Sequence, residues 1–158
     1  MSRSRNKDRS ERPAAPGRGR VILYTIAAVI CTLGLADAVY LTVIALTGEA
    51  AACGGQTGCQ EVLGSAYSRV GPIPVAAFGL LAYFSAFTFA TFAAFNYARA
   101  RLFFMITVGC MFVGTLWLLY VQAFILHAFC RYCLFSAAIT FLLAGLVVAA
   151  PPASRSAE

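Results

Sequence analysis

Long apolar segments alternate with short polar ones along the chain. The apolar segments cover residues 21–46, 74–97, 102–126 and 134–150. A helix rises about 1.5 Å per residue, so the first three segments exceed the roughly 30 Å hydrocarbon core of a bilayer. The fourth is the apolar body of a helix whose first turn lies near residue 130. The pattern therefore predicts four transmembrane helices.

The composition supports this reading. Hydrophobic residues make up 61% of the 158 residues and charged residues only 11%, and the mean hydropathy is +0.80. A typical soluble domain is about 45–50% apolar and about 25% charged, so a water-soluble or disordered fold is excluded. We expect an all-α integral membrane protein: a four-transmembrane-helix bundle with an outer loop that carries a cysteine pair and a short surface helix over 60–69.

The charges predict the orientation. The net charge is +6, and seven of the twelve basic residues lie in residues 1–20, directly before the first apolar segment. Because cytoplasmic flanks are enriched in Lys and Arg, residues 1–20 are predicted to be a disordered cytoplasmic tail rather than a nucleic-acid-binding arm. The membrane domain is then 21–150, followed by a short tail, 151–158. Arg99 and Arg101 fall on the same side, so both termini are predicted to be cytoplasmic.

Four of the six cysteines fall on the opposite, outer face, where disulfides can form and persist. Cys130 and Cys133 form a CxxC motif at the start of the last helix, where unpaired amides and the helix dipole favour a thiolate. Cys53 and Cys59 enclose a glycine-rich loop that can reach a soluble partner. Thiol–disulfide exchange could carry electrons from the partner through the loop pair to the CxxC. A membrane quinone, which accepts two electrons, is the expected acceptor.

Other interpretations of the cysteines stay open. Four cysteines could bind zinc, although the spacing of Cys53 and Cys59 is longer than usual for such a site. The pairs could also be inert structural disulfides in a non-enzymatic membrane protein. Cys31 and Cys110 are expected to be free apolar side chains without a role, and no metal is expected.

Two polar residues in the apolar segments are weaker candidates. An acid such as Asp37 is costly in hydrocarbon and often functional, but a structural role is the favoured interpretation. His127, one helical turn before Cys130 on the same face, could assist proton transfer to a reduced quinone; a plain interfacial histidine is the alternative. Phe78, near the outer end of the second helix, is a candidate ring contact.

The order of these motifs resembles the vitamin K epoxide reductase family over residues 21–150. The resemblance rests on the loop cysteine pair, Ser65 six positions after Cys59, the GPIP sequence at 71–74 and the FCRYC sequence at 129–133. It implies a four-helix bundle around a quinone. The unrelated DsbB type of quinone reductase has its CxxC and spaced pair in the reverse order.

The resemblance also implies a role for each cysteine. By family analogy Cys133 faces the quinone, Cys130 exchanges with Cys59, and Cys53 exchanges with a thioredoxin-like partner. Ser65 would lie near the bound ring; its alternative role is to cap the short loop helix.

Two further positions bear on the substrate. In vertebrate members an Asn and a Tyr contact the vitamin K head group, and the corresponding positions here are Val75 and Ala137. These apolar residues argue against epoxide reduction.

The sequence therefore predicts an enzyme of the inner (plasma) membrane. It would oxidise a separate, exported thioredoxin-fold (DsbA-like) partner and reduce ubiquinone or menaquinone, which supports disulfide formation outside the cytoplasm. Lipid surrounds the helices, and no nucleic acid is bound. The alternatives are a quinone or vitamin K epoxide reductase without an oxidative-folding role, and the non-enzymatic membrane protein.

Overall fold

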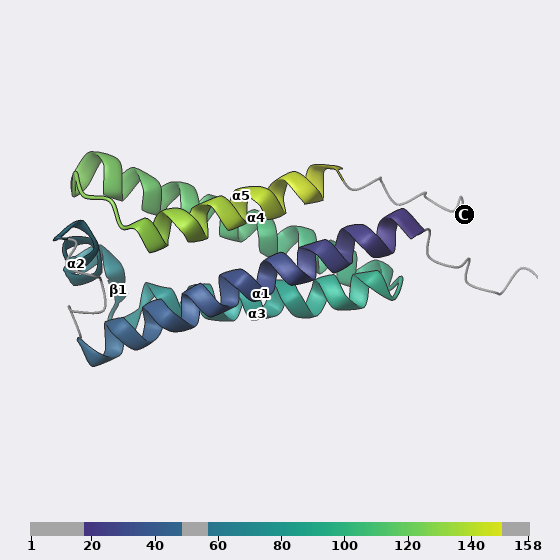
Figure 1. The fold of residues 1–158 in the computed structure, drawn as a ribbon, viewed down its shortest axis with the longest axis horizontal. Helices are drawn as coiled ribbons and strands as arrows, with labels where there is room; N and C mark the ends of the chain where they lie inside the picture. Colours follow the sequence, from purple (N-terminus) through teal and green to yellow (C-terminus); the bar gives the residue numbers. More distant parts are fainter. Residues whose placement is uncertain (1–17, 49–56, 150–158) are drawn as a thin grey trace, which may run out of the picture.

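The computed structural model describes residues 18–48 and 57–149. Its long helices are α1 (Arg18–Thr47), α3 (Val75–Ala94), α4 (Ala98–Tyr120) and α5 (Arg131–Ala149). A short π-helix, η3 (Val121–Ile125), continues α4. Within these described ranges, four helices are long and apolar enough to cross a membrane. The predicted all-α membrane bundle is confirmed (Figure 1).

The helices form a closed ring of neighbours, in which α1 and α4 each contact both α3 and α5. Small residues allow α1 and α3 to approach closely, because Ala27 on α1 and Ala86, Ala90 and Ala93 on α3 are completely buried. Helix α1 begins at the end of the bundle where α5 finishes (Figure 1). Helix α2 lies at the other end, which we call the cysteine end.

The turn between α3 and α4 closes the end opposite the cysteines. Asn96 has a positive φ of 69°, and its N–H donates to the Ala93 carbonyl at 3.1 Å, while the Tyr97 N–H donates to the Phe92 carbonyl at 3.3 Å. This is a Schellman motif, in which asparagine replaces the usual glycine. The Asn96 side chain accepts a hydrogen bond of 3.1 Å from Arg20, which ties the start of α1 to this turn.

The loop between α1 and α3 contains more structure than the single short helix predicted over 60–69. Helix α2 (Thr57–Gly64) and a 3₁₀ turn, η2 (Ala66–Ser68), precede a hairpin of β1 (Arg69–Val70) and β2 (Ile73–Pro74). The predicted helix is interrupted because Ser65 is extended, with φ −70° and ψ 156°. The tight turn at Gly71, with a φ of 63°, then pairs the two strands.

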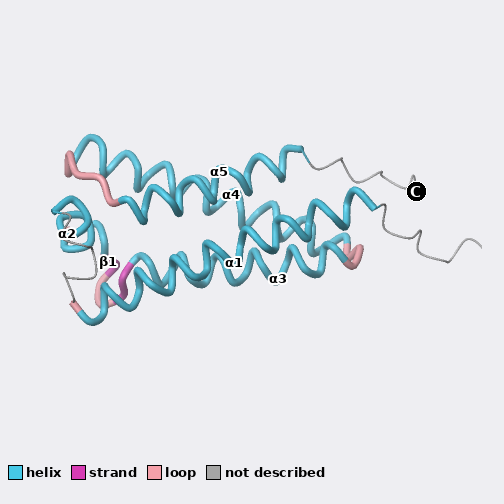
Figure 2. The backbone as a smooth tube through the Cα atoms, in the orientation of Figure 1, coloured by secondary structure: helices cyan, strands magenta, loops and turns pink. Residues whose placement is uncertain are grey.

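The connection from α4 to α5 is not continuous helix either. Residues 127–130 form an irregular segment, shown as a loop in Figure 2. His127 has a φ of 51° and an exposed side chain. The expectation that His127 shares a helical face with Cys130 is therefore wrong, because the helix ends before His127.

Candidate active site

Cys130 occupies the N-cap position of α5. The Leu134 N–H donates to the Cys130 carbonyl at 2.9 Å, which is the first hydrogen bond of the helix. The Cys130 sulfur accepts hydrogen bonds from the backbone N–H groups of Tyr132 and Cys133. An N-cap side chain normally satisfies these free amides through oxygen; here sulfur takes that place. The CxxC spacing therefore makes Cys130 both a helix cap and a stabilised thiolate.

The pKa of the Cys130 thiol reflects this environment. A hydrogen bond from the Cys133 side chain lowers the pKa to about 6; burial opposes that effect, and the two backbone N–H groups reinforce it. The charge of Asp37 acts in the opposite direction and raises the pKa. Both CxxC cysteines are free, and Cys130 is completely buried. At neutral pH the structure thus favours a nucleophilic Cys130 thiolate that solvent does not reach.

Cys59 on α2 lies beside this cap. It is 1% exposed and belongs to one buried cluster with Cys130, Val62 and Ala128. Cys59 is disulfide-bonded, whereas Cys53 lies outside the described residues. The predicted meeting of the loop cysteine region with the CxxC is therefore seen for Cys59.

An apolar cavity opens on the other side of the CxxC. It has about 880 Å³ of empty space, including the part open to the outside, and its walls come from α1, α3, α4, α5 and the segment 62–74. Four of the residues singled out from the sequence line it: Cys133, Ser65, Val75 and Ala137. Phe78 does not line this cavity. Its side chain is 47% exposed, so its contact with a quinone ring stays a prediction that this cavity does not include.

Two of the three serines in the cavity wall, Ser65 and Ser68, donate their hydroxyl hydrogens to nearby carbonyl groups. The Ser65 hydroxyl donates to the Val62 carbonyl at 2.7 Å, and the Ser68 hydroxyl is 2.6 Å from the Leu63 carbonyl. Ser65 therefore satisfies a carbonyl at the end of α2 and makes no side-chain cap on η2. Toward the cavity its hydroxyl can only accept hydrogen bonds.

Gln122 is a site residue that the sequence analysis missed. It lies in η3, is 3% exposed and lines the cavity. Its Oε1 accepts a hydrogen bond of 3.0 Å from the Cys130 N–H, and its main-chain carbonyl accepts one of 3.2 Å from Ala128. The available signal was an uncharged amide inside the apolar segment 102–126, because a polar side chain in hydrocarbon needs a partner.

A buried hydroxyl network supports the cavity from the side of α3. The Tyr83 hydroxyl lies 2.9 Å from both the carbonyl oxygen and the hydroxyl of Ser136, and 3.1 Å from the Thr140 hydroxyl. Ser136 also lines the cavity. Gly34 on α1 leaves the room that the Tyr83 ring occupies. The sequence analysis missed this network as well, because its members lie on different helices.

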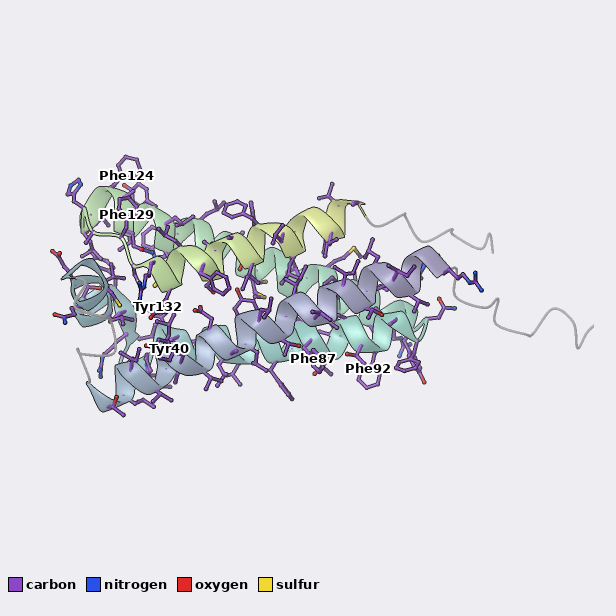
Figure 3. All side chains as sticks on the ribbon, viewed as in Figure 1. Tyr40, Phe87, Phe92, Phe124, Phe129 and Tyr132 are labelled. Carbon is purple, nitrogen blue, oxygen red and sulfur yellow. The ribbon has the colours of Figure 1, made fainter. Side chains whose placement is uncertain are left out.

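Asp37 is buried on α1, with 8% exposure, and its Oδ2 has no hydrogen-bond partner among the described residues. Nearby on the same helix, Tyr40 contacts Tyr132 of the CxxC, and the ring centroids lie 5.1 Å apart (Figure 3). The Arg131 guanidinium lies 4.9 Å from the centroid of the Tyr132 ring. This stack packs α1 against the first turn of α5.

Comparison with protein families identifies the fold and the site together. The model of the vitamin K epoxide reductase family matches residues 25–148, which include parts of all four long helices and the CxxC. The chain belongs to this family. Vitamin K epoxide reductase family proteins are membrane oxidoreductases that use thiol–disulfide chemistry and quinones. Comparison with curated proteins gives no match.

The cavity fits the kind of molecule that this family uses. Its walls are mostly apolar, as a quinone ring requires, and the Cys133 thiol lies in the wall. No group of three or more metal-ligating side chains lies together within the described ranges. The zinc interpretation would also need Cys53, which lies outside these ranges.

Proposed function

We propose that the chain is a membrane thiol:quinone oxidoreductase that oxidises an exported thioredoxin-fold, DsbA-like protein and reduces a membrane quinone. One observation carries the proposal. The CxxC lies between two surroundings: Cys130 is buried in one cluster with Cys59, and Cys133, which packs against that cluster, also lines the apolar cavity. This arrangement suits a motif that accepts electrons on one side and delivers them on the other.

Electrons pass from the partner to the quinone in three steps, and each step transfers two electrons and two protons. The partner dithiol reduces the Cys53–Cys59 disulfide and is itself oxidised to a disulfide. The resulting loop dithiol reduces the Cys130–Cys133 disulfide when Cys59 attacks Cys130, through a mixed disulfide of these two residues. The CxxC dithiol then becomes a disulfide again while the quinone, when bound, takes up two electrons and two protons.

The residues of the chain divide this work. The cap of α5 stabilises Cys130 as a thiolate, which makes it a good leaving group when Cys53 attacks Cys59 of the mixed disulfide, so that the Cys53–Cys59 disulfide forms and Cys130 is released. The Cys133 thiol donates a hydrogen bond to the Cys130 sulfur. Val75 and Ala137 add apolar surface to the cavity, which supports a quinone substrate rather than an epoxide that needs polar contacts at these positions.

The charges support an inner-membrane orientation with both termini in the cytoplasm. Arg18, Arg20, Arg99 and Arg101 lie at the ends of α1 and α4 that are remote from the cysteine end. Because basic residues favour the cytoplasmic side, the cysteine end faces the exterior or periplasm. An exported partner can reach the loop pair there, and its oxidation supports disulfide formation in exported proteins.

The experiment follows quinone absorbance while the detergent-purified full chain receives a reduced thioredoxin-fold donor. We expect quinone reduction by the native chain, its loss in Cys133→Ala and a slow rate in Cys53→Ala. A small dithiol such as dithiothreitol can reduce the CxxC directly, so it should restore turnover to Cys53→Ala. Cys110→Ala, which removes a free thiol on α4, is the matched control. Ubiquinone and menaquinone are compared as acceptors.

Two results would overturn the proposal. One is an absence of turnover with either quinone and either donor. The other is turnover that survives Cys133→Ala, because the electrons would then reach the quinone without the CxxC.

A further inference from the structure

The amide of Gln122 is held in one orientation. Its oxygen faces the Cys130 N–H at 3.0 Å, and its Nε2 faces the Leu118 carbonyl at 3.5 Å. The Cys130 N–H needs an acceptor and the Leu118 carbonyl needs a donor. The amide oxygen therefore faces Cys130 and the amide nitrogen faces Leu118. An amide nitrogen carries two hydrogens, and the Leu118 carbonyl takes at most one of them. Gln122 therefore retains an N–H donor.

The surroundings place this donor at the CxxC. The Oε1 contact keeps the amide against the Cys130 backbone, and Gln122 and Cys133 line the same cavity. The π-helix directs the side chain of Gln122 and its main-chain carbonyl toward the loop before Cys130. π-bulges of this kind occur frequently at functional sites.

Three serines of the cavity wall are engaged, whereas Tyr67, which also lines the cavity, is 46% exposed. The hydroxyl hydrogens of Ser65 and Ser68 go to carbonyls of α2, and the Ser136 hydroxyl pairs with Tyr83. Thr115 also lines the cavity, but two helical turns separate it from Gln122, a rise of about 10 Å. Gln122 is thus a buried donor in the cavity wall that also contains Cys133.

We propose that Gln122 binds the quinone by donating this N–H to a carbonyl oxygen, while its Oε1 positions Cys130. The inference rests on the proposed function and names the polar contact that orients the quinone over Cys133. A donor at this place also stabilises the oxygen as electron density moves onto it. Gln122 would then set the affinity for the quinone and the geometry of the sulfur at the same time.

The test distinguishes the role of the amide oxygen of Gln122 from the role of its amide nitrogen. Gln122→Glu keeps an oxygen for the Cys130 N–H but removes the donor when the carboxyl is ionised, and regains an O–H donor when it is protonated. Gln122→Leu removes both functions. Phe124→Leu is the matched control, because this side chain lies in the same π-helix and is 67% exposed. The KM for a soluble short-chain quinone is measured with dithiothreitol as the electron donor, from mildly acidic to mildly alkaline pH.

We expect the KM of Gln122→Glu to be about tenfold above that of the native chain at alkaline pH, the effect of one lost hydrogen bond, and to fall toward the native value at acidic pH. The KM of Gln122→Leu should stay high at every pH, and the KM of Phe124→Leu should match that of the native chain. Cys130, Cys133 and Asp37 face the same region, so each variant is compared with the native chain at the same pH. Equilibrium quinone binding, followed by the fluorescence of Trp117, accompanies turnover.

A native-like KM for Gln122→Glu at every pH, with only Gln122→Leu impaired, would leave Gln122 as a support for Cys130 and overturn the quinone contact. Unchanged KM values in both variants would overturn it as well. If the native chain binds quinone without turnover, the proposed function fails, and the binding constants of the variants still test Gln122. An absence of both binding and turnover overturns both proposals.

Discussion

A Cβ atom on Gly58 would lie 2.8 Å from the carbonyl oxygen of Phe129, closer than real Cβ contacts allow. This close approach joins α2 to the loop that leads into the CxxC, and it involves the residues directly before Cys59 and Cys130. Glycine at position 58 is therefore what lets the two cysteines share one buried cluster.

Gly58→Ala should push α2 away from this loop and impair exchange between Cys59 and Cys130. We would measure the yield of the Cys59–Cys130 disulfide after mild oxidation, in a background that carries Cys53→Ala and Cys133→Ala. The yield should fall about fivefold or more, since overpacking typically costs about 1–3 kcal/mol. Gly64→Ala is the control on the same helix, because nothing lies within 4 Å of a Cβ there. Equal yields in the two variants would contradict this account of Gly58.

The thiolate of Cys130 should form with a midpoint near pH 6 in the reduced protein, as followed by thiolate ultraviolet absorbance and corrected with Cys130→Ala. The hydrogen bond from Cys133 is the largest cause of the low pKa, so Cys133→Ala should raise the midpoint toward the ordinary value of about 8.5. Below the midpoint Cys130 is a neutral thiol, and its exchange rate should fall as the pH falls. A midpoint that does not move in Cys133→Ala would show that the helix cap alone lowers the pKa.

Asp37 should influence the same titration in the opposite direction. Its negative charge raises the pKa of Cys130, so Asp37→Asn should lower the midpoint below about 6, whereas Asp37→Glu, which keeps the charge, should change it little. The same absorbance titration measures both variants. An upward shift in Asp37→Asn would mean that the carboxyl acts through structure and not through its charge.

Gly34→Ala should destabilise the bundle. The added methyl group would collide with the Tyr83 ring, because the ring's Cδ1 lies 2.6 Å from the position that a Cβ on residue 34 would occupy. We expect a loss of about 1–3 kcal/mol in the free energy of unfolding in detergent. Gly109→Ala adds a methyl group where nothing lies within 4 Å, and it should leave stability unchanged or slightly raised, because alanine favours the helix. Equal free energies of unfolding for the two alanine variants would contradict this prediction.

The four apolar helices could be predicted from the sequence alone, because their length and hydropathy do not depend on neighbouring segments. The sequence also placed the CxxC at the start of the last helix, and the family resemblance pointed to Ser65, Val75 and Ala137, all three of which line the cavity. Local sequence was less informative where the chain leaves regular helix. The extended Ser65, the Gly71 hairpin and the π-helix at Gln122 are departures in backbone geometry that a pattern of apolar and polar positions does not reveal.

Which polar groups contact one another depends on how the helices pack. The Gln122 amide reaches Cys130 because α4 ends in a π-helix, and Tyr83 reaches Ser136 because Gly34 on a third helix makes room for its ring. Phe78 and His127, attractive by position, are turned outward instead. Hydrophobicity is a property of each residue, so membrane-spanning helices can be recognised one segment at a time. A hydrogen bond or a close contact between helices forms only when packing brings the two groups within contact distance.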